Sequence, residues 1–392
     1  MSKDREFDLV LYGATGFTGR LVAEYVLQRY GDDPDLRWAM AGRSEEKLAA
    51  VRDEIGAPAD TPLITADAGN PASLRAMAER TRLVLTTVGP YQLYGSGLVA
   101  VCAKSGTDYV DLCGEPAWMR EMIDKHEEAA TESGARIVFS CGFDSIPFDL
   151  GVFFLEQAAK KQFGATAPRV KGRVRDMQGG FSGGTAASLK ATLAAAQNNP
   201  SVLALLRDPF ALTPGFSGPE QPRDTKPAYD ETLEVWCAPF IMAPINTRNV
   251  HRSNALMGHP YGEDFVYDEM VIVGPGEEGE AKAKAMARAD VLGGPDAPKP
   301  GEGPSREERE AGRYDILFVG EMPDGRVIRA SVSGDLDPGY GSTSRMITES
   351  ALCLLRDATD TPGGIWTTAP AMGEKLIRRL VDNAGLKFQL ET

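Results

Sequence analysis

Short apolar runs alternate with amphipathic stretches over the first third of the chain. The first run, Phe7–Tyr12, is almost entirely apolar, as expected of a strand covered by helices on both faces. In Arg20–Arg29 the apolar residues recur at helical spacing. The same alternation predicts further strands at Arg37–Ala41, Leu63–Thr65, Leu83–Thr87, Asp108–Asp111 and Arg136–Ser140, and helices at Glu45–Ile55, Pro71–Arg80, Gly97–Ser105 and Pro116–Ser133. This pattern is typical of an α/β, Rossmann-type doubly wound parallel sheet, which we expect over residues 1–146.

After Pro147 the alternation gives way to a mixture of helical and strand-like segments. We expect residues 147–343 to form a second, α+β domain with a mixed or antiparallel sheet, serving substrate binding and dimerisation. Residues 344–392 read as helical and are expected to pack back on the first domain. The predicted elements are helices at Phe148–Gln162, Thr185–Gln197, Ser344–Leu355 and Ala371–Asn383, strands at Arg169–Met177, Val266–Val273, Asp315–Val319 and Val327–Val332 (the last two a hairpin), and surface loops at Thr213–Lys226 and Gly293–Arg309.

Composition places the chain among soluble globular proteins. Of its 392 residues, 42% are hydrophobic and 25% charged, with a formal net charge of −14; such a negative charge argues against general affinity for nucleic acid or anionic membranes. None of the five cysteines forms a C-x-x-C pair, so a zinc knuckle or redox pair is not indicated. With neither an apolar leader nor an apolar run long enough to span a bilayer, we expect a cytoplasmic protein. Any contact with the inner face of the plasma membrane would be peripheral and made through partners.

The glycine-rich turn GATGFTG lies directly between the first strand and the first helix. Its glycines allow a tight turn, the approach of a pyrophosphate to the backbone, and close packing of helix on strand. The exposed N–H groups at the helix N-terminus then receive the anion. The predicted cofactor-binding residues here are Gly13, Ala14, Thr15, Gly16, Phe17, Thr18 and Gly19.

The end of the second strand indicates which dinucleotide is bound. Sites for NAD usually carry Asp or Glu at this point, whereas this chain has Arg43 and Ser44. A guanidinium beside a hydroxyl suits a 2′-phosphate, so we expect NADPH. Ser44 also fits a helix N-cap, and both roles are compatible. Asp67, after the third strand, is placed either to bind the adenine edge or to cap the next helix.

The later strands should direct further residues into the same crevice, because the carboxyl ends of parallel strands face the ligand. Val88, Gly89 and Pro90 should border the nicotinamide half. Tyr91 and Tyr94 follow, either as proton donors or as packing under the loop. Residues after the fifth and sixth strands also point there: Asp111, Cys113, Glu115, Cys141, Asp144 and Ser145.

Other chemistry is less well supported by the sequence. No histidine is near the crevice cysteines in sequence, so a cysteine nucleophile is not favoured. The three histidines lack the spacing of metal ligands, and we predict no metal site. The turn at Ser182–Leu189 is a candidate site for a substrate phosphate or carboxylate, or else an ordinary capped helix.

Taken together, several segments resemble the saccharopine dehydrogenase-like oxidoreductases, and most of all their trans-acting enoyl reductase branch in actinobacteria. They are GATGFTGRLVAEYV, AGRSEEKL, VGPYQLYG, YVDLCGE, CGFDSIPFDLG, the SGGT turn and GGIWTTAPAMGEKL. The resemblance implies an NADPH-dependent reductase of chains carried by a polyketide synthase that lacks its own working enoyl reductase domain. The implied products are long-chain lipids of the cell envelope.

Residue roles follow if the reaction is enoyl reduction. A donor must stabilise the enolate and an acid must protonate the α-carbon. Tyr91 and Tyr94 are candidates for either role, while Asp144 or Glu115 qualifies only if burial raises its pKa. Our catalytic candidates are therefore Tyr91, Tyr94 and Asp144.

Two other functions remain open at this point. One is a reductase or dehydrogenase of a free imine, amino acid or ketone, which would need clustered arginines such as Arg169, Arg173, Arg175, Arg248 and Arg252. The other is a non-catalytic dinucleotide sensor. A carrier-borne acyl chain instead favours a long apolar groove with a basic rim, for which Arg169–Arg175 is the candidate patch. We also expect a homodimer.

Overall fold

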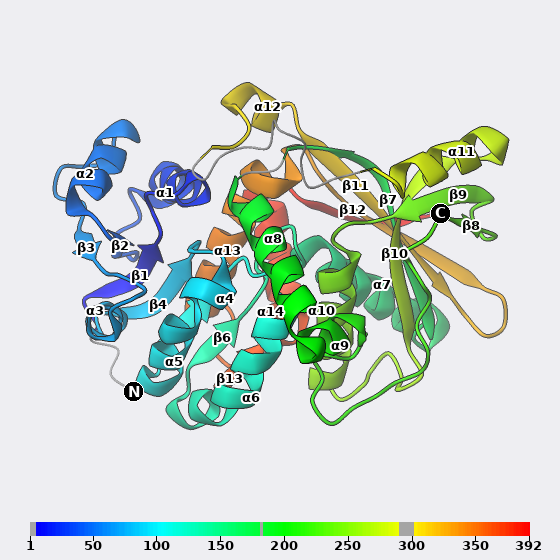
Figure 1. Cartoon of the computed structure of the whole chain (residues 1–392), viewed down its shortest axis with the longest axis horizontal. Helices are drawn as coiled ribbons and strands as arrows, with labels where there is room; N and C mark the ends of the chain where they lie inside the picture. Colours follow the sequence, from blue (N-terminus) through cyan, green and yellow to red (C-terminus); the bar gives the residue numbers. More distant parts are fainter. Residues whose placement is uncertain (1–4, 181–182, 290–301) are drawn as a thin grey trace.

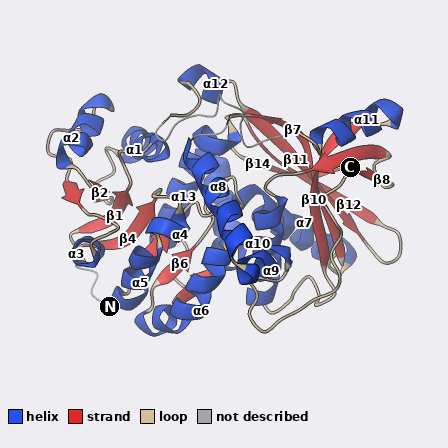
Figure 2. Cartoon of the chain, in the orientation of Figure 1, coloured by secondary structure: helices blue, strands red, loops and turns tan. Residues whose placement is uncertain are grey.

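Two seven-stranded sheets form the framework of the protein (Figures 1 and 2). The structure is a computed structural model and describes residues 5–180, 183–289 and 302–392. The sheets lie at opposite ends of the long axis, with helices packed between them (Figure 2). No helix within the described ranges is long and apolar enough to cross a membrane.

The first sheet is entirely parallel and has the strand order β13-β6-β5-β4-β1-β2-β3. Six of its strands are those predicted from the apolar runs: β1 (Phe7–Tyr12), β2 (Trp38–Gly42), β3 (Leu63–Thr65), β4 (Thr81–Thr86), β5 (Asp108–Val110) and β6 (Arg136–Val138). The order 3-2-1-4-5-6 is that of a dinucleotide-binding sheet, which confirms the predicted fold class. The crossover helices are α1 (Phe17–Tyr30), α2 (Glu45–Glu54), α3 (Pro71–Ala78), α4 (Tyr91–Tyr94), α5 (Ser96–Ser105) and α6 (Pro116–Ser133).

The second sheet is mixed and has the order β14-β12-β11-β7-β10-β9-β8. Only the central pair, β7 with β10, is parallel. The predicted hairpin is confirmed as β11 paired with β12. The strands are β7 (Arg169–Gln178), β8 (Ala228–Asp230), β9 (Val235–Pro239), β10 (Val266–Gly274), β11 (Arg313–Glu321), β12 (Val327–Gly334) and β14 (Lys387–Glu391).

Helices of the second half of the chain pack against this sheet, mainly on the side that faces the first one (Figures 1 and 2). In Figure 1, α8 runs between the two sheets. Of the predicted loop Gly293–Arg309, the part up to residue 301 lies outside the described residues. The helices are α7 (Ile146–Phe163), α8 (Gly183–Asn198), α9 (Pro200–Arg207), α10 (Ala243–Leu256), α11 (Gly276–Met286), α12 (Arg306–Glu310), α13 (Thr343–Arg356) and α14 (Thr368–Arg379), with π-helical turns at Pro338–Ser342 and Leu380–Ala384.

The C-terminal segment belongs to both halves of the molecule. Strand β13 (Gly364–Trp366) extends the first sheet beside β6, and β14 extends the second beside β12. Helix α13 packs on α1, where the buried Glu349 carboxylate accepts hydrogen bonds from Tyr25 at 2.8 Å and Tyr30 at 2.6 Å. Arg379 of α14 donates to the same carboxylate at 2.8 Å. These contacts join the end of the chain to the first crossover helix.

Candidate active site

A cavity of about 1240 Å³ lies between the carboxyl edge of the first sheet and the second half of the chain. The predicted catalytic residues Tyr91, Tyr94 and Asp144 all line it. Most predicted cofactor residues do so too: Gly13, Thr15, Gly16, Phe17, Thr18, Arg43, Asp67, Val88 and Gly89. The remaining four, Ala14, Gly19, Ser44 and Pro90, are absent from the lining, and lie beside it in the same turns.

The glycine-rich turn is shaped to bring an anion close to the start of α1. Gly13 has a φ of +97°, and a Cβ there would lie 2.8 Å from Thr87 Oγ1. At Gly19 a Cβ would lie 2.0 Å from the carbonyl oxygen of Gly13, so only glycine allows this approach. No side chain caps α1, and its first turn carries no acidic residue. The helix N-terminus therefore offers its N–H groups and positive dipole to the cavity.

Arg43 provides a cation at the adenosine end of the cavity. Its side chain is exposed and makes no ion pair within the described part of the chain. The adjacent Ser44 Oγ accepts Lys47 N–H at 3.3 Å and so caps α2. The Ser44 hydroxyl can still donate its own hydrogen bond to a ligand. Tyr12, at the end of β1, has no sequence signal of a ligand-binding role, yet it lines the cavity with Arg43 and Asp67; burial raises its pKa to about 12.

Asp67 does not cap α3, because Asn70 does so through its side-chain oxygen. The Oδ1 atom of Asp67 instead accepts Gly69 N–H at 2.8 Å and closes a local turn. Its side chain is exposed. The ligand-binding alternative for Asp67 thus remains compatible with its position.

Tyr91 is held by backbone groups on both sides of its hydroxyl. The hydroxyl accepts Leu112 N–H at 3.1 Å and donates to the Thr86 carbonyl at 3.4 Å. Its ring packs on Trp118 at a centroid distance of 5.6 Å, and burial raises its pKa well above the usual range. This is the packing role that the sequence left open as the alternative to proton donation.

Glu115 fixes the short helix α4 that carries both tyrosines. Its buried carboxylate accepts the backbone N–H of Tyr91 at 2.8 Å and of Gln92 at 2.9 Å. Gln92 Nε2 donates to the same carboxylate at 2.9 Å. With these acceptor positions occupied, Glu115 is suited to positioning α4. Tyr94, 47% exposed, stands at the opening of the cavity.

Asp144 is the carboxyl group of the cavity that is best suited to donate a proton near neutral pH. It lies in the loop between β6 and α7, and no hydrogen bond to its carboxyl is found among the described residues. Burial raises its pKa to about 7. Its neighbour Ser145 accepts a hydrogen bond from Asn249 Nδ2 at 2.8 Å, which fixes the loop against α10. A carboxyl group with this pKa can donate a proton near neutral pH.

The second half of the chain supplies a mostly apolar wall. Ser188 and Thr192 of α8 face the cavity, so the predicted turn at Ser182–Leu189 contributes a hydroxyl; Ser182 itself lies outside the described residues. No local motif marked most of this wall, because its residues come from separate segments. They are Met177, Gly179, Gly180, Leu206, Ile241, Met242, Pro244, Ile245, Gly303, Pro304, Glu308, Pro338, Gly339, Tyr340 and Thr343.

The five arginines considered as substrate ligands are engaged elsewhere, and none lines the cavity. Three on β7 form ion pairs: Arg169 with Asp268, Arg173 with Asp230 and Asp268, and Arg175 with Asp315 and Glu391. The candidate basic patch Arg169–Arg175 is therefore neutralised. Arg248 donates to the Leu206 carbonyl at 2.6 Å, and Arg252 to the Ile365 carbonyl at 2.6 Å.

Alternative catalytic groups are buried away from this chemistry. Burial raises the pKa of the Cys113 and Cys141 thiols well above the usual range, so neither is a ready thiolate. His251 is packed between Phe210 and Phe265, and burial lowers its pKa to about 3. Among the described residues, no group of His, Cys, Asp and Glu is arranged to hold a metal ion.

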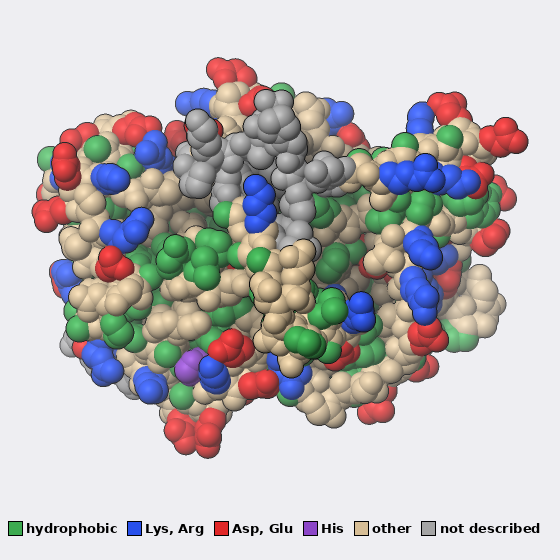
Figure 3. All heavy atoms as spheres, viewed as in Figure 1, with side chains coloured by type: hydrophobic (Ala, Val, Ile, Leu, Met, Phe, Trp, Pro, Cys, Tyr) green, Lys and Arg blue, Asp and Glu red, His purple; other side chains and the backbone are tan. Residues whose placement is uncertain are grey.

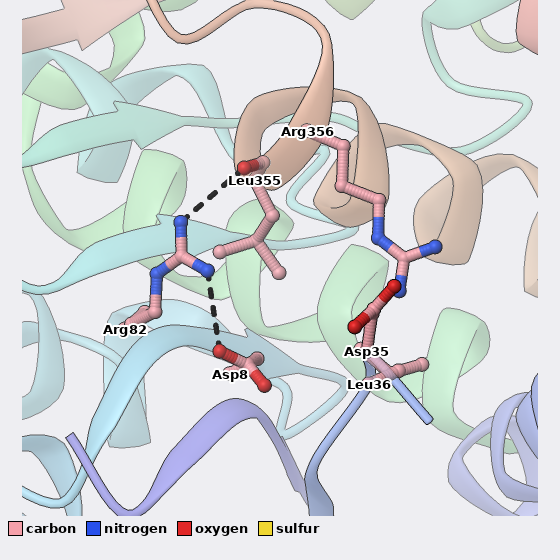
Figure 4. A pocket seen from close by; sticks show the side chains of 6 residues that line it. All are labelled: Asp8, Asp35, Leu36, Arg82, Leu355 and Arg356. Carbon is pink, nitrogen blue, oxygen red and sulfur yellow. Dashed lines mark hydrogen bonds and ion pairs between the residues drawn. The ribbon is translucent and has the colours of Figure 1, made fainter. Parts of the chain in front are cut away.

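A second cavity, of about 350 Å³, lies where β1 and β4 begin, at the amino ends of the strands (Figure 4). Arg82 donates there to the Asp8 carboxylate at 3.2 Å and the Leu355 carbonyl at 3.3 Å. Arg356 pairs with Asp33 at 2.7 Å. Three charged side chains of this cavity, those of Asp8, Arg82 and Arg356, are thus paired within the protein, and none of the predicted site residues lines the cavity. The lining residues are Asp8, Asp35, Leu36, Arg82, Leu355 and Arg356.

Comparison with known proteins agrees with this geometry. Residues 9–138 match the saccharopine dehydrogenase NADP binding domain. A candidate trans-acting enoyl reductase of Mycobacterium tuberculosis is 43% identical, covering 98% of this chain and 97% of the relative. The trans-acting enoyl reductase of Mycobacterium ulcerans is 39% identical, covering 97% and 96%. The chain belongs to the trans-acting enoyl reductase family.

Solved structures place this enoyl reductase family member in a wider fold group. Saccharopine dehydrogenase from Saccharomyces cerevisiae superposes with a TM-score of 0.56 at 13% identity, covering 98% of this chain and all of that one. Homospermidine synthase from Legionella pneumophila, solved in complex with NAD, gives 0.56 at 9% identity, covering 98% and 91%. At these identities the likeness concerns the fold alone.

Proposed function

We propose that the protein uses NADPH to reduce the carbon–carbon double bond of α,β-unsaturated acyl thioesters presented by a separate carrier. The observation that carries this proposal is the make-up of the cavity. One end has a glycine turn and a cation that fit a dinucleotide phosphate; the facing wall is mostly apolar and carries no arginine among the residues that the structure describes. Such a wall suits an acyl chain better than a small carboxylate, which would require a charged partner.

The residues of the first domain fit NADPH. The turn at Gly13–Thr18 and the N-terminus of α1 would hold the pyrophosphate, and Arg43 with the Ser44 hydroxyl would hold the 2′-phosphate. Val88 and Gly89 would border the nicotinamide. When bound, NADPH supplies the hydride that forms the new C–H bond at the β-carbon.

The protein must stabilise the negative charge that develops on the thioester oxygen, and it must supply a proton to the α-carbon. As the β-carbon is reduced, the π electrons of the double bond move toward the thioester oxygen, which needs a hydrogen-bond donor. We assign that role to the Tyr94 hydroxyl at the cavity opening. Asp144 then gives its proton to the α-carbon and becomes a carboxylate, which regains a proton from water. The Tyr91 hydroxyl, being tied to Leu112 and Thr86, holds the loop.

We also propose the source of the substrate and the kind of product. The family resemblance implies a polyketide synthase as carrier of the chain and a cell-envelope lipid as product. A cytoplasmic location and a homodimer stay predictions.

The test uses the purified protein, NADPH and a long-chain 2-enoyl thioester of N-acetylcysteamine. We expect NADPH oxidation with formation of the saturated thioester, and deuterium from labelled NADPH at its β-carbon. Parallel reactions contain keto acids with ammonia, or simple ketones. Turnover of those substrates without reduction of the enoyl thioester would overturn the proposal in favour of a small-molecule dehydrogenase. Binding of NADPH without turnover of any substrate would favour the sensor.

A further inference from the structure

The segment between Asp176 and Asp208 has an unusual charge for this chain. It contains no Asp or Glu, and its only charged residues are Lys190 and Arg207, whereas the whole chain has a net charge of −14. Both basic side chains are exposed and make no ion pair within the described ranges. This segment forms the end of β7 and the helices α8 and α9. Between its flanking residues Asp176 and Asp208, the segment thus carries two basic side chains that are free to bind an anionic partner.

Helix α9 is apolar and only partly covered. Its sequence, PSVLALLR, contains five aliphatic residues, and none of its eight residues is buried. Leu203 is 37% exposed, while Leu206, one turn later, lines the cavity. A helix whose outer face exposes apolar side chains to solvent is typical of a surface that contacts a partner.

Other exposed apolar side chains stand around the same cavity. Leu93 is 62% exposed, Tyr94 47% and Met177 40%, and all three line it. We call Leu93, Met177 and Leu203 the rim patch, and leave out Tyr94, whose hydroxyl is assigned above to the thioester oxygen. In Figure 3, apolar side chains gather on both sides of α8 in the middle of the visible face.

A hydrogen-bond relay joins the two sides of the cavity opening. Gln92 Nε2, fixed on Glu115 at 2.9 Å, also donates to Thr192 Oγ1 of α8 at 3.4 Å. Helix α9 packs on α8 and on α6. Helices α4, α8 and α9 therefore border one opening.

We propose that α4, α8 and α9 form the docking face for an acidic carrier protein that presents the acyl chain on a phosphopantetheine arm. This inference rests on the proposed function, because a substrate that stays tethered requires its carrier to sit where the arm leaves the cavity. Lys190 and Arg207 attract the phosphate of the arm and the acidic carrier. The rim patch supplies the apolar contact.

The experiment compares one enoyl chain in two forms: loaded on a phosphopantetheinylated acyl carrier protein, and as the free N-acetylcysteamine thioester. The test variant is K190E/R207E. The matched control is K160E/K161E, which reverses two exposed lysines in the last turn of α7, away from the cavity lining. At low salt we expect the KM for the carrier-bound chain to rise on the order of tenfold in the test variant alone. High salt should reduce this difference.

The free thioester separates docking from catalysis. We expect its kcat/KM to be the same in the wild type and in both variants, because Lys190 and Arg207 do not line the cavity. A second variant, Leu203→Ser, should raise only the carrier-bound KM and leave the melting temperature unchanged, since Leu203 is not buried.

Three outcomes would overturn the docking face. The carrier-bound KM is unchanged in both test variants; or it rises equally in K160E/K161E, showing a general charge effect; or K190E/R207E instead abolishes binding to phosphatidylglycerol vesicles, which would assign the surface to a membrane. Failure of the wild type to reduce even the free thioester would overturn the proposed function, and is distinct from all three.

Discussion

Replacing Asp144 by Asn tests whether this carboxyl is the proton donor. Burial raises its pKa to about 7, so the wild type should hold the required proton below that pH and lose it above. We expect kcat/KM to be level in mildly acidic solution and to fall about tenfold per pH unit above pH 7. At pH 9 it should be roughly one hundredth of its plateau.

The amide of Asp144→Asn cannot act as this acid. General acid catalysis contributes about 10²–10⁴-fold, so the variant should be slower by that factor at pH 6 and show no decline at higher pH. At pH 9, where the wild type has itself lost about a hundredfold, the gap between the two enzymes should be about a hundredfold smaller than at pH 6. The assay is NADPH oxidation with the free enoyl thioester across this range, with protein integrity followed by circular dichroism.

Asp111 provides a matched control. Burial also raises its pKa to about 7, yet its carboxylate accepts hydrogen bonds from Cys113 N–H and Ser140 N–H, and it does not line the cavity. Asp111→Asn should therefore retain the decline of kcat/KM above pH 7. Loss of the decline in Asp111→Asn but not in Asp144→Asn would refute the assignment. So would an undiminished rate in Asp144→Asn.

Three further substitutions test cofactor binding, the positioning of α4 and the pH dependence of stability. Arg43→Ala should weaken NADPH binding about ten- to a hundredfold and leave NADH binding unchanged, as measured by fluorescence titration. Glu115→Gln places an NH₂ group against the N–H donors of Tyr91 or Gln92; we expect a loss of about 1–3 kcal/mol in urea unfolding and a higher KM. Burial raises the pKa of Glu156 to about 8, so the native state keeps a proton that the unfolded chain releases above its usual pKa of 4.5. The free energy of unfolding should fall as pH rises from about 5 to 8, by at most roughly 4–5 kcal/mol, and Glu156→Gln should remove that part of the decline.

The first domain was predictable because its signals are local. The parallel strands contain short apolar runs that alternate with helical stretches, and the turn before α1 needs glycine at Gly13 and Gly19 for reasons of backbone geometry alone. The position of Arg43 follows from the end of the second strand. Such features depend on residues within a few positions of one another, so they can be recognised in a single sequence.

The rest of the site depends on partners that are distant in the chain. The Tyr91 hydroxyl is occupied by Leu112, and the arginines of β7 are neutralised by Asp230 and Asp268. Neither pairing has a local signal, which is why Tyr91 was a catalytic candidate and Arg169–Arg175 a basic rim. Strand β13 is three residues long and is stabilised by its place beside β6. The equally short β3, β5 and β6 were predictable because they alternate with helical stretches, whereas β13 lies within residues 344–392, which read as helical.

The positions of β13 and β14 have a consequence for synthesis of the protein on the ribosome. Each is the outermost strand of its sheet next to β6 or β12, and each is translated after the strand with which it pairs. Until β13 and β14 have left the ribosome, the nascent chain therefore exposes the unpaired backbone edges of β6 and β12, and such edges are templates for pairing with other chains. Docking of β13 and β14 then closes these edges.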